Sequence, residues 1–186
     1  MGSTGSGKLW TPNSKHSGAP LGGEKTGKNP TDRGKLGAKI NLLVDGRGAP
    51  ISVVLTGANR HDKVSAFELI VSVVTKSPAH KEQHLCADEA YDSDDLREFV
   101  ASAGYEAHIK INPTRKDLAE GAAEHPANED SSKRIHSARR WMVERTILWL
   151  TKRRSLRTRW SKKAENWLAL VQLACAHILL NLAVFG

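Results

Sequence analysis

The pattern of apolar and polar positions predicts alternating strands and helices, the first of which form a β-hairpin. Ile40–Val44 and Ile51–Leu55 are apolar, β-branched runs, and the residues between them include Asp45 and Gly46. An Asp-Gly pair between two such runs is a strong hairpin signal. Asp45 is therefore predicted to be a turn residue rather than a catalytic one.

A helix is predicted over residues 64–74, where apolar side chains recur at helical spacing, with Asp62 or Ser65 as its cap. The polar connector that follows holds His80 and His84, two histidines four residues apart. A metalloprotease helix would carry glutamate directly after the first histidine, and this chain has lysine there. Zinc binding by this pair is therefore disfavoured.

The next stretch predicts an acidic residue at the end of a strand. Residues 85–87 form a short apolar run that ends on Asp88, and Ser93 is placed to cap a helix over 96–103. A further strand is predicted over 105–111. Because ligand sites of α/β sheets lie at the carboxyl ends of strands, Asp88 is a site candidate.

Two helices are predicted near the end of the chain, a basic one over 139–154 and an apolar one over 164–185. The basic helix has one acid, Glu144, and its apolar side is predicted to consist of Trp141, Met142, Ile147, Leu148 and Leu150. Glu144 either pairs with Arg140 one turn away or is a metal-binding carboxylate directed at a phosphodiester. The second helix has no formally charged residue after Glu165, but polar residues interrupt it, so a core helix is favoured over a membrane span.

Charge is distributed unevenly along the 186 residues. The net charge is +8, and Lys133–Lys163 alone contains twelve Lys or Arg and one acid. A basic stripe on a nearly neutral body predicts a polyanionic partner, DNA or RNA rather than a membrane. The two cysteines lie in apolar runs and are expected to be reduced thiols of a cytoplasmic protein.

Composition divides the chain into two parts. Residues 1–37 are rich in Gly, Lys, Ser and Pro, which predicts a flexible basic segment in which Lys25, Lys28 and Arg33 contact phosphates without sequence specificity. Residues 38–186 are predicted to form the folded domain, and 112–133 a polar insert within it.

The predicted order of elements, with one acid after a central strand and another on a late helix, is the plan of an RNase H-like nucleic-acid transferase. Such enzymes cleave and join phosphodiesters with two divalent ions roughly 4 Å apart, held by three carboxylates. Oxygen ligands suit Mg²⁺ or Mn²⁺. The fold class expected is a mixed α/β sheet with flanking helices.

Seven ordered blocks of this sequence resemble the DDE transposases of bacterial insertion sequences, in particular the insertion-sequence-five type. The blocks are GGEKTGKNPTDRGK (22–35), LVDGRG (43–48), GANRHD (57–62), ADEAYD (87–92), RRWMVERT (139–146), RWSKKAEN (159–166) and LACA (173–176). The resemblance implies DNA strand transfer that depends on Mg²⁺ or Mn²⁺. Its implied partners are the transposon ends and target DNA.

The resemblance also implies site residues. Asp88 matches the second catalytic acid and Glu144 the third, both as metal ligands. Arg140 resembles a phosphate contact one turn before that glutamate, Lys152 lies one residue from the signature lysine, and Arg145 and Arg153 are further candidates for DNA contact.

The sequence departs from the family at the first catalytic position. The family has Asp eleven residues before the glutamate of the GGEK block, and this chain has Asn13 there. Asn cannot bridge two cations as a carboxylate does. The resemblance therefore implies a degenerate, N-terminally truncated transposase with most of the first strand missing and the sheet incomplete at that strand. The alternatives are a non-catalytic DNA-binding remnant and a regulator that associates with an intact transposase or with its own copies.

Overall fold

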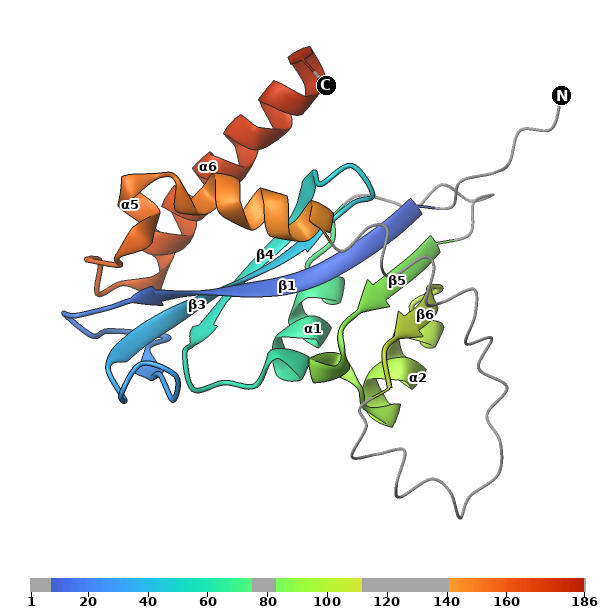
Figure 1. The fold of residues 1–186 in the computed structure, drawn as a ribbon, viewed down its shortest axis with the longest axis horizontal. Coiled ribbons are helices and arrows are strands. Elements are labelled where there is room, and N and C mark those ends of the chain that lie inside the picture. The colour runs from blue at the N-terminus through green and yellow to red at the C-terminus, as the bar shows by residue number, and fades with distance from the viewer. Residues whose placement is uncertain (1–7, 75–82, 112–140, 186) are drawn as a thin grey trace, which may run out of the picture.

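The protein contains one mixed sheet (Figure 1), seen in a computed structural model that describes residues 8–74, 83–111 and 141–185. The strands of this part of the chain are β1 (Lys8–Gly18), β2 (Gly27–Lys28), β3 (Leu36–Val44), β4 (Pro50–Gly57), β5 (Gln83–Ala87) and β6 (Glu106–Ile109). Their order is β2-β3-β1-β5-β6, and β4 also pairs with β3. β1, β3 and β4 are antiparallel, whereas β1, β5 and β6 run parallel. This arrangement is the RNase H-like sheet expected from the sequence.

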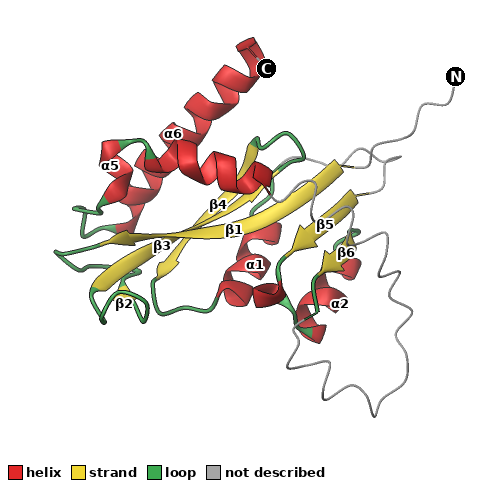
Figure 2. Cartoon of the chain, viewed as in Figure 1, coloured by secondary structure: helices red, strands yellow, loops and turns green. Residues whose placement is uncertain are grey.

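Helices cover both faces of the sheet (Figure 2). One face carries α1 (Asp62–Val71) and α2 (Asp94–Ser102), which pack on Leu43 of β3 and Leu85 of β5. The other face carries the 141–151 helix, α5 (Arg154–Arg157) and α6 (Ala164–Phe185). Their apolar residues form one cluster with the alternate side chains of β3, which are Ile40, Leu42 and Val44.

The predicted hairpin is confirmed as β3 and β4, and Asp45 is its turn residue. The Asp45 carboxylate accepts hydrogen bonds from the backbone N–H groups of Arg47 and Ala49, both at 2.9 Å. Gly48 adopts a φ of 83°, a left-handed conformation that glycine takes without a steric penalty. The Asp-Gly signal therefore located the turn, but the left-handed residue is Gly48 rather than Gly46, because the loop is longer than a two-residue Asp-Gly turn.

The structure corrects the expectation of a flexible 1–37 segment. β1 and β2 both lie within it, and β1 is an eleven-residue strand with hydrogen-bonded neighbours on both sides. The first strand is thus present at the centre of the sheet, contrary to the expected gap. The high content of Gly and Lys hid it, because tertiary pairing can override weak strand propensity.

Two helix predictions also need correction. α1 ends at Val71 rather than 74, and its N-cap is His61 rather than Asp62 or Ser65. On the 141–151 helix, Trp141 and Leu148 are exposed, whereas Val143, Thr146 and Leu150 are buried. Leu150 and Ile147 thus belong to the core side as predicted, whereas Trp141 and Leu148 do not, and Val143 and Thr146 were missed.

α6 is, among the described residues, the one helix whose length and composition would allow it to cross a membrane. Its first half packs into the core through Trp167, Val171, Ala174 and Ile178. Its second half projects beyond the sheet in Figure 1 and exposes Leu180, Val184 and Phe185. The polar insert expected at 112–133 lies outside the described residues.

Candidate active site

Asn13 lies in the middle of β1, on the face of the sheet that the 141–151 helix covers. It pairs with Leu42 of β3 in antiparallel register, so the two side chains share a face. Leu42 packs in the same cluster as Val143 and Leu150 of that helix. The half-buried Asn13 side chain accepts a 2.7 Å hydrogen bond from the Ser14 backbone N–H through Oδ1.

Asp88 follows β5 directly and is half-buried. β1 and β5 pair in parallel from Lys8 with Gln83 to Trp10 with Leu85. Asp88 thus lies one residue beyond β5, the strand that neighbours β1 on the side away from β3. Leu85 and Ala87 of β5 pack against α1 and α2, so positions 84 and 86 point to the opposite face, the face of Asn13.

Glu144 is an exposed residue of the 141–151 helix above this face. Ile147 and Thr151 of the same helix line a small hollow together with Lys15 of β1. Glu144 precedes Ile147 by three residues, on the same side of the helix and about 4.5 Å towards its start. Asn13 precedes Lys15 by two residues, about 7 Å along the strand. Glu144 therefore lies over the part of β1 that contains Asn13.

Asn13 thus lies under the helix that carries Glu144, and Asp88 follows the strand next to β1, although the three positions are distant along the chain. Their donor atoms are oxygens, two carboxylates and one amide, a set suited to Mg²⁺ or Mn²⁺. Asn13 contributes a single neutral oxygen that already accepts the Ser14 N–H. The set therefore fits one divalent ion. A second ion would need a bridging carboxylate at position 13, where Asn13 offers only a neutral ligand.

Tyr91 lies close to Asp88 in the 3-10 helix η1 (Glu89–Tyr91). Burial raises the pKa of its hydroxyl, and the negative charges of Asp62 and Asp88 raise this pKa further. Glu89 forms a 2.8 Å ion pair with Lys110, the residue after β6. Asp88 thus stands beside a neutral phenol, in a loop that a surface ion pair joins to the end of β6.

The basic residues predicted to contact DNA have different surroundings. The Arg145 guanidinium lies 4.7 Å from the ring centroids of both Trp141 and Trp149, and it donates to the Arg47 carbonyl. Arg153 bonds His177 of α6 at 2.7 Å, and Lys152 is exposed. Arg140 lies outside the described residues.

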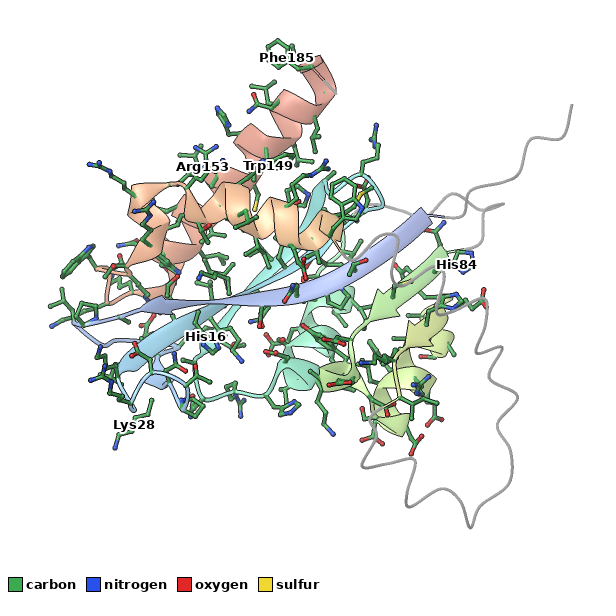
Figure 3. All side chains as sticks on the ribbon, viewed as in Figure 1. His16, Lys28, His84, Trp149, Arg153 and Phe185 are labelled. Atoms are coloured by element: carbon green, nitrogen blue, oxygen red, sulfur yellow. The ribbon has the colours of Figure 1, made fainter. Side chains whose placement is uncertain are left out.

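Lys25, Lys28 and Arg33 are exposed in the segment between β1 and β3, where Lys28 is part of β2 and the other two lie on loops. Figure 3 shows Lys28 at the opposite end of the sheet from His84, and Arg153 above the sheet on the side of the helices. The predicted phosphate contacts therefore form two groups, one on the helices and one on the loops.

Sequence reasoning missed a cluster formed by His84, Glu106 and His108, whose ligand atoms lie within 4.8 Å of one another. His84 was considered only with His80, which lies outside the described residues. Burial lowers the pKa of His108, while Glu106 acts in the opposite direction. A signal for this cluster was available in the sequence. Glu106 and His108 lie two residues apart on one predicted strand, and His84 directly precedes another predicted strand, the run 85–87.

The profile of the family described as transposase DDE domain matches residues 10–179. The chain belongs to this family of transposases. Members of the family act on DNA in transposition and generally use divalent metal ions.

Two bacterial relatives match this transposase domain. It is 32% identical over 165 residues to a protein described as the transposase of insertion sequence element IS402 of Burkholderia cepacia, covering 86% of this chain and 71% of that protein. It is 30% identical over 144 residues to one described for element IS6501 of Brucella ovis, covering 77% of this chain and 98% of that protein.

A solved structure with the same fold is piggyBac transposase in a synaptic complex with hairpin DNA. The TM-score is 0.53 at 14% identity, and the match covers 90% of this chain and 45% of that chain. At this identity the likeness shows the fold alone, which is the RNase H-like arrangement of the transposase catalytic core.

Proposed function

We propose that this transposase domain binds transposon-end and target DNA across the face that carries Asn13, Asp88 and Glu144, and that Asn13 leaves its strand-transfer chemistry degenerate. The observation that supports the proposal is the strand order, in which β1 carries Asn13 on the face of the 141–151 helix and pairs with β5, the strand that Asp88 follows. In this proposal Asp88 and Glu144 hold a single Mg²⁺ or Mn²⁺ ion. When bound, the ion supplies Lewis-acid activation of a phosphodiester and of its attacking hydroxyl.

The side chains around the ion would have separate tasks. Asp88 is fixed by its place at the end of β5, and Glu144 is carried by a helix anchored in the core. Lys152 and Arg153 form the turn between the 141–151 helix and α5, where they would hold the DNA backbone through its phosphates. Asn13 would occupy the first catalytic position with a neutral side chain. Because a negative charge is missing there, the affinity for a second metal ion would be lower.

The proposal is tested by Mn²⁺-dependent nicking of a supercoiled plasmid. The natural chain is expected to nick weakly or not at all, and Asn13→Asp is expected to raise the rate by at least about tenfold, because a carboxylate then completes the site. Adding Asp88→Ala or Glu144→Ala to Asn13→Asp should abolish the gain. Asn59→Asp, which adds the same charge on an exposed loop, is the matched control.

A result in which neither the natural chain nor Asn13→Asp nicks DNA would contradict the catalytic assignment. Nicking that survives both alanine substitutions would contradict it as well, since the activity would then arise elsewhere. Asp95→Asn, at an exposed carboxylate on α2, controls for the general loss of an acid.

The second candidate is a non-catalytic DNA-binding remnant or regulator in the bacterial cytoplasm. Its supporting observation is the set of exposed apolar side chains along α6, among which Leu173, Leu180 and Phe185 face solvent. Such a surface suits contact with another copy of the chain or with an intact transposase. Co-purification of an active transposase with the natural chain, and its loss with Leu180→Glu, would favour this alternative.

A further inference from the structure

His84, Glu106 and His108 project from β5 and β6 on one face of the sheet and form a cluster of metal-binding atoms. The parallel register pairs His84 with Glu106 and Cys86 with His108. The intervening residues Leu85 and Ala87 pack against α1 and α2, so His84, Glu106 and His108 lie on the opposite face. The His84 side chain, labelled in Figure 3, stands at the start of β5, away from the 141–151 helix.

The ligand atoms of these residues converge. His84 Nδ1 lies 3.0 Å from His108 Nε2 and 2.9 Å from Glu106 Oε2, and His108 Nε2 lies 3.6 Å from Glu106 Oε1. Donors bonded at about 2.0–2.1 Å to a tetrahedral ion are about 3.3 Å apart. The two distances to Glu106 involve different carboxylate oxygens, and with one ligand atom from each residue the three atoms all lie within 4.8 Å of one another. A rotation of the exposed Glu106 carboxylate would bring one oxygen towards both nitrogens and form the coordination triangle.

We propose that His84, His108 and Glu106 bind one divalent transition-metal ion of the Zn²⁺ class. Two imidazole nitrogens and one carboxylate oxygen suit Zn²⁺ and its borderline-soft neighbours, whereas Mg²⁺ prefers oxygen ligands throughout. Three protein ligands leave the fourth tetrahedral position for water or another ligand.

Burial at the cluster is compatible with entry of an ion. The His84 and His108 side chains are 20% and 11% exposed, so their rings are held by the surrounding sheet. The Glu106 side chain is 60% exposed, so the carboxylate lies at the surface and can meet an incoming ion. The arrangement combines two fixed ligands with one mobile ligand.

This site is separate from the proposed catalytic position. His84 precedes Asp88 by four residues along an extended segment, which corresponds to about 13 Å. The two ions of a two-metal catalytic site lie only about 4 Å apart. An ion at His84 would instead connect β5 with β6, which in the described part of the chain is the edge strand next to β5. It would thereby stabilise the edge of the sheet.

The experiment is calorimetric titration of the full chain with ZnCl₂ after treatment with EDTA, in an excess of MgCl₂ that saturates oxygen-ligand sites. One Zn²⁺ per chain is expected, with a rise in Tm, and Co²⁺ should give the visible absorption of a tetrahedral nitrogen and oxygen site. Glu106→Gln and His108→Gln should each weaken binding more than about a hundredfold, beyond the usual cost of losing an outer-shell partner.

Matched controls are Glu98→Gln on α2 and His177→Gln on α6, both at exposed positions, which should bind Zn²⁺ like the natural chain. Circular dichroism checks that each variant folds, and the exposed position of Glu106 keeps at least that variant informative. Binding that is absent from the natural chain, or unchanged in Glu106→Gln and His108→Gln, would overturn the metal site and leave an ordinary hydrogen-bonded cluster.

Asp88→Asn separates the two sites. This variant should keep Zn²⁺ binding, because the cluster does not include Asp88. If Zn²⁺ binding is lost in Asp88→Asn, the ion belongs to the catalytic position and the separate site is wrong. If Asn13→Asp fails to nick DNA while Zn²⁺ still binds, the proposed function fails and the metal site stands.

Discussion

Arg159 illustrates how a single residue can belong to a basic stripe in sequence and to the interior in structure. Its side chain is fully buried, and the guanidinium donates to the carbonyls of Ser161 at 2.8 Å and Lys162 at 2.9 Å. A longer contact of 3.5 Å reaches the Lys25 carbonyl. Arg159 therefore fixes the connector before α6 against the loop after β1, and it is not available to bind DNA phosphates.

Replacing Arg159 with Met should reduce the free energy of unfolding by about 3 kcal/mol. The substitution keeps much of the apolar stem but removes the charge-assisted hydrogen bonds to the Ser161 and Lys162 carbonyls, which contribute about 1.5–3 kcal/mol each. Urea denaturation measures the change. Arg154→Met, at an exposed position, should change stability by less than about 0.5 kcal/mol. Equal effects of the two substitutions would contradict the role assigned to Arg159.

At the scale of elements, the turn of the β3–β4 hairpin supports the helix that carries Glu144. Thr146 Oγ1 donates to the Gly48 carbonyl at 2.6 Å, and Arg145 donates to the Arg47 carbonyl. A Cβ at Gly48 would lie 3.0 Å from both Thr146 Oγ1 and an Arg145 side-chain nitrogen. The turn thus fits the helix closely at the residues that follow Glu144.

Gly48→Ala is expected to reduce the free energy of unfolding by about 2–3 kcal/mol. About 1–2 kcal/mol comes from the left-handed backbone, and the remainder from the contacts with the helix. Gly34→Ala is the matched control, since Gly34 has a φ of 72° but open space around its Cβ position. Thermal or urea unfolding of both variants measures the difference. A Gly34→Ala effect as large as that of Gly48→Ala would show that the helix contact adds nothing.

At the scale of the whole molecule, the two faces of the sheet differ in the charges that they carry. Lys15, Lys152 and Arg153 all belong to the face of the 141–151 helix, which is also the face of Asn13. α1 and α2 on the other face include acidic residues in their first turns. A polyanion is therefore expected to approach the helix face rather than the α1 and α2 face.

The logarithm of the association constant of the full chain for DNA should fall linearly with the logarithm of the salt concentration. The expected slope is about −0.9 for each phosphate contact. Lys152→Ala should make the slope shallower by about 0.9, because an exposed lysine on the binding face is lost. Lys63→Ala on α1 is the control and should leave the slope unchanged. Fluorescence anisotropy across a salt series measures both. An equal change in the two variants would show that the face was assigned wrongly.

Strong local signals allowed several elements to be predicted. The Asp-Gly pair located the hairpin, Ser93 caps α2 through a 3.4 Å bond to the Leu96 N–H, and α6 spans the predicted residues 164–185. The candidate-site positions came from the order of acids relative to these elements and from the family resemblance. The assignment of Asp88 and Glu144 as ligands stays a prediction that the nicking experiment tests.

The missed features depend on contacts between distant residues. β1 has Gly, Lys and Ser in place of a β-branched run, and it becomes a strand because β3 and β5 bond to both its edges. The His84 cluster requires the register between β5 and β6, which no local pattern specifies. Thr146 is buried because it meets the hairpin turn, although a polar residue predicts exposure.

The sequence by itself determined which segments become strands and helices wherever turn chemistry, capping and apolar periodicity agree, since these act between residues close along the chain. It also determined the excess of positive charge and the presence of a neutral residue at position 13. Only the tertiary structure decided which side chains share a face. Strand register controls that choice, because a shift of one residue moves every side chain of a strand to the other side of the sheet.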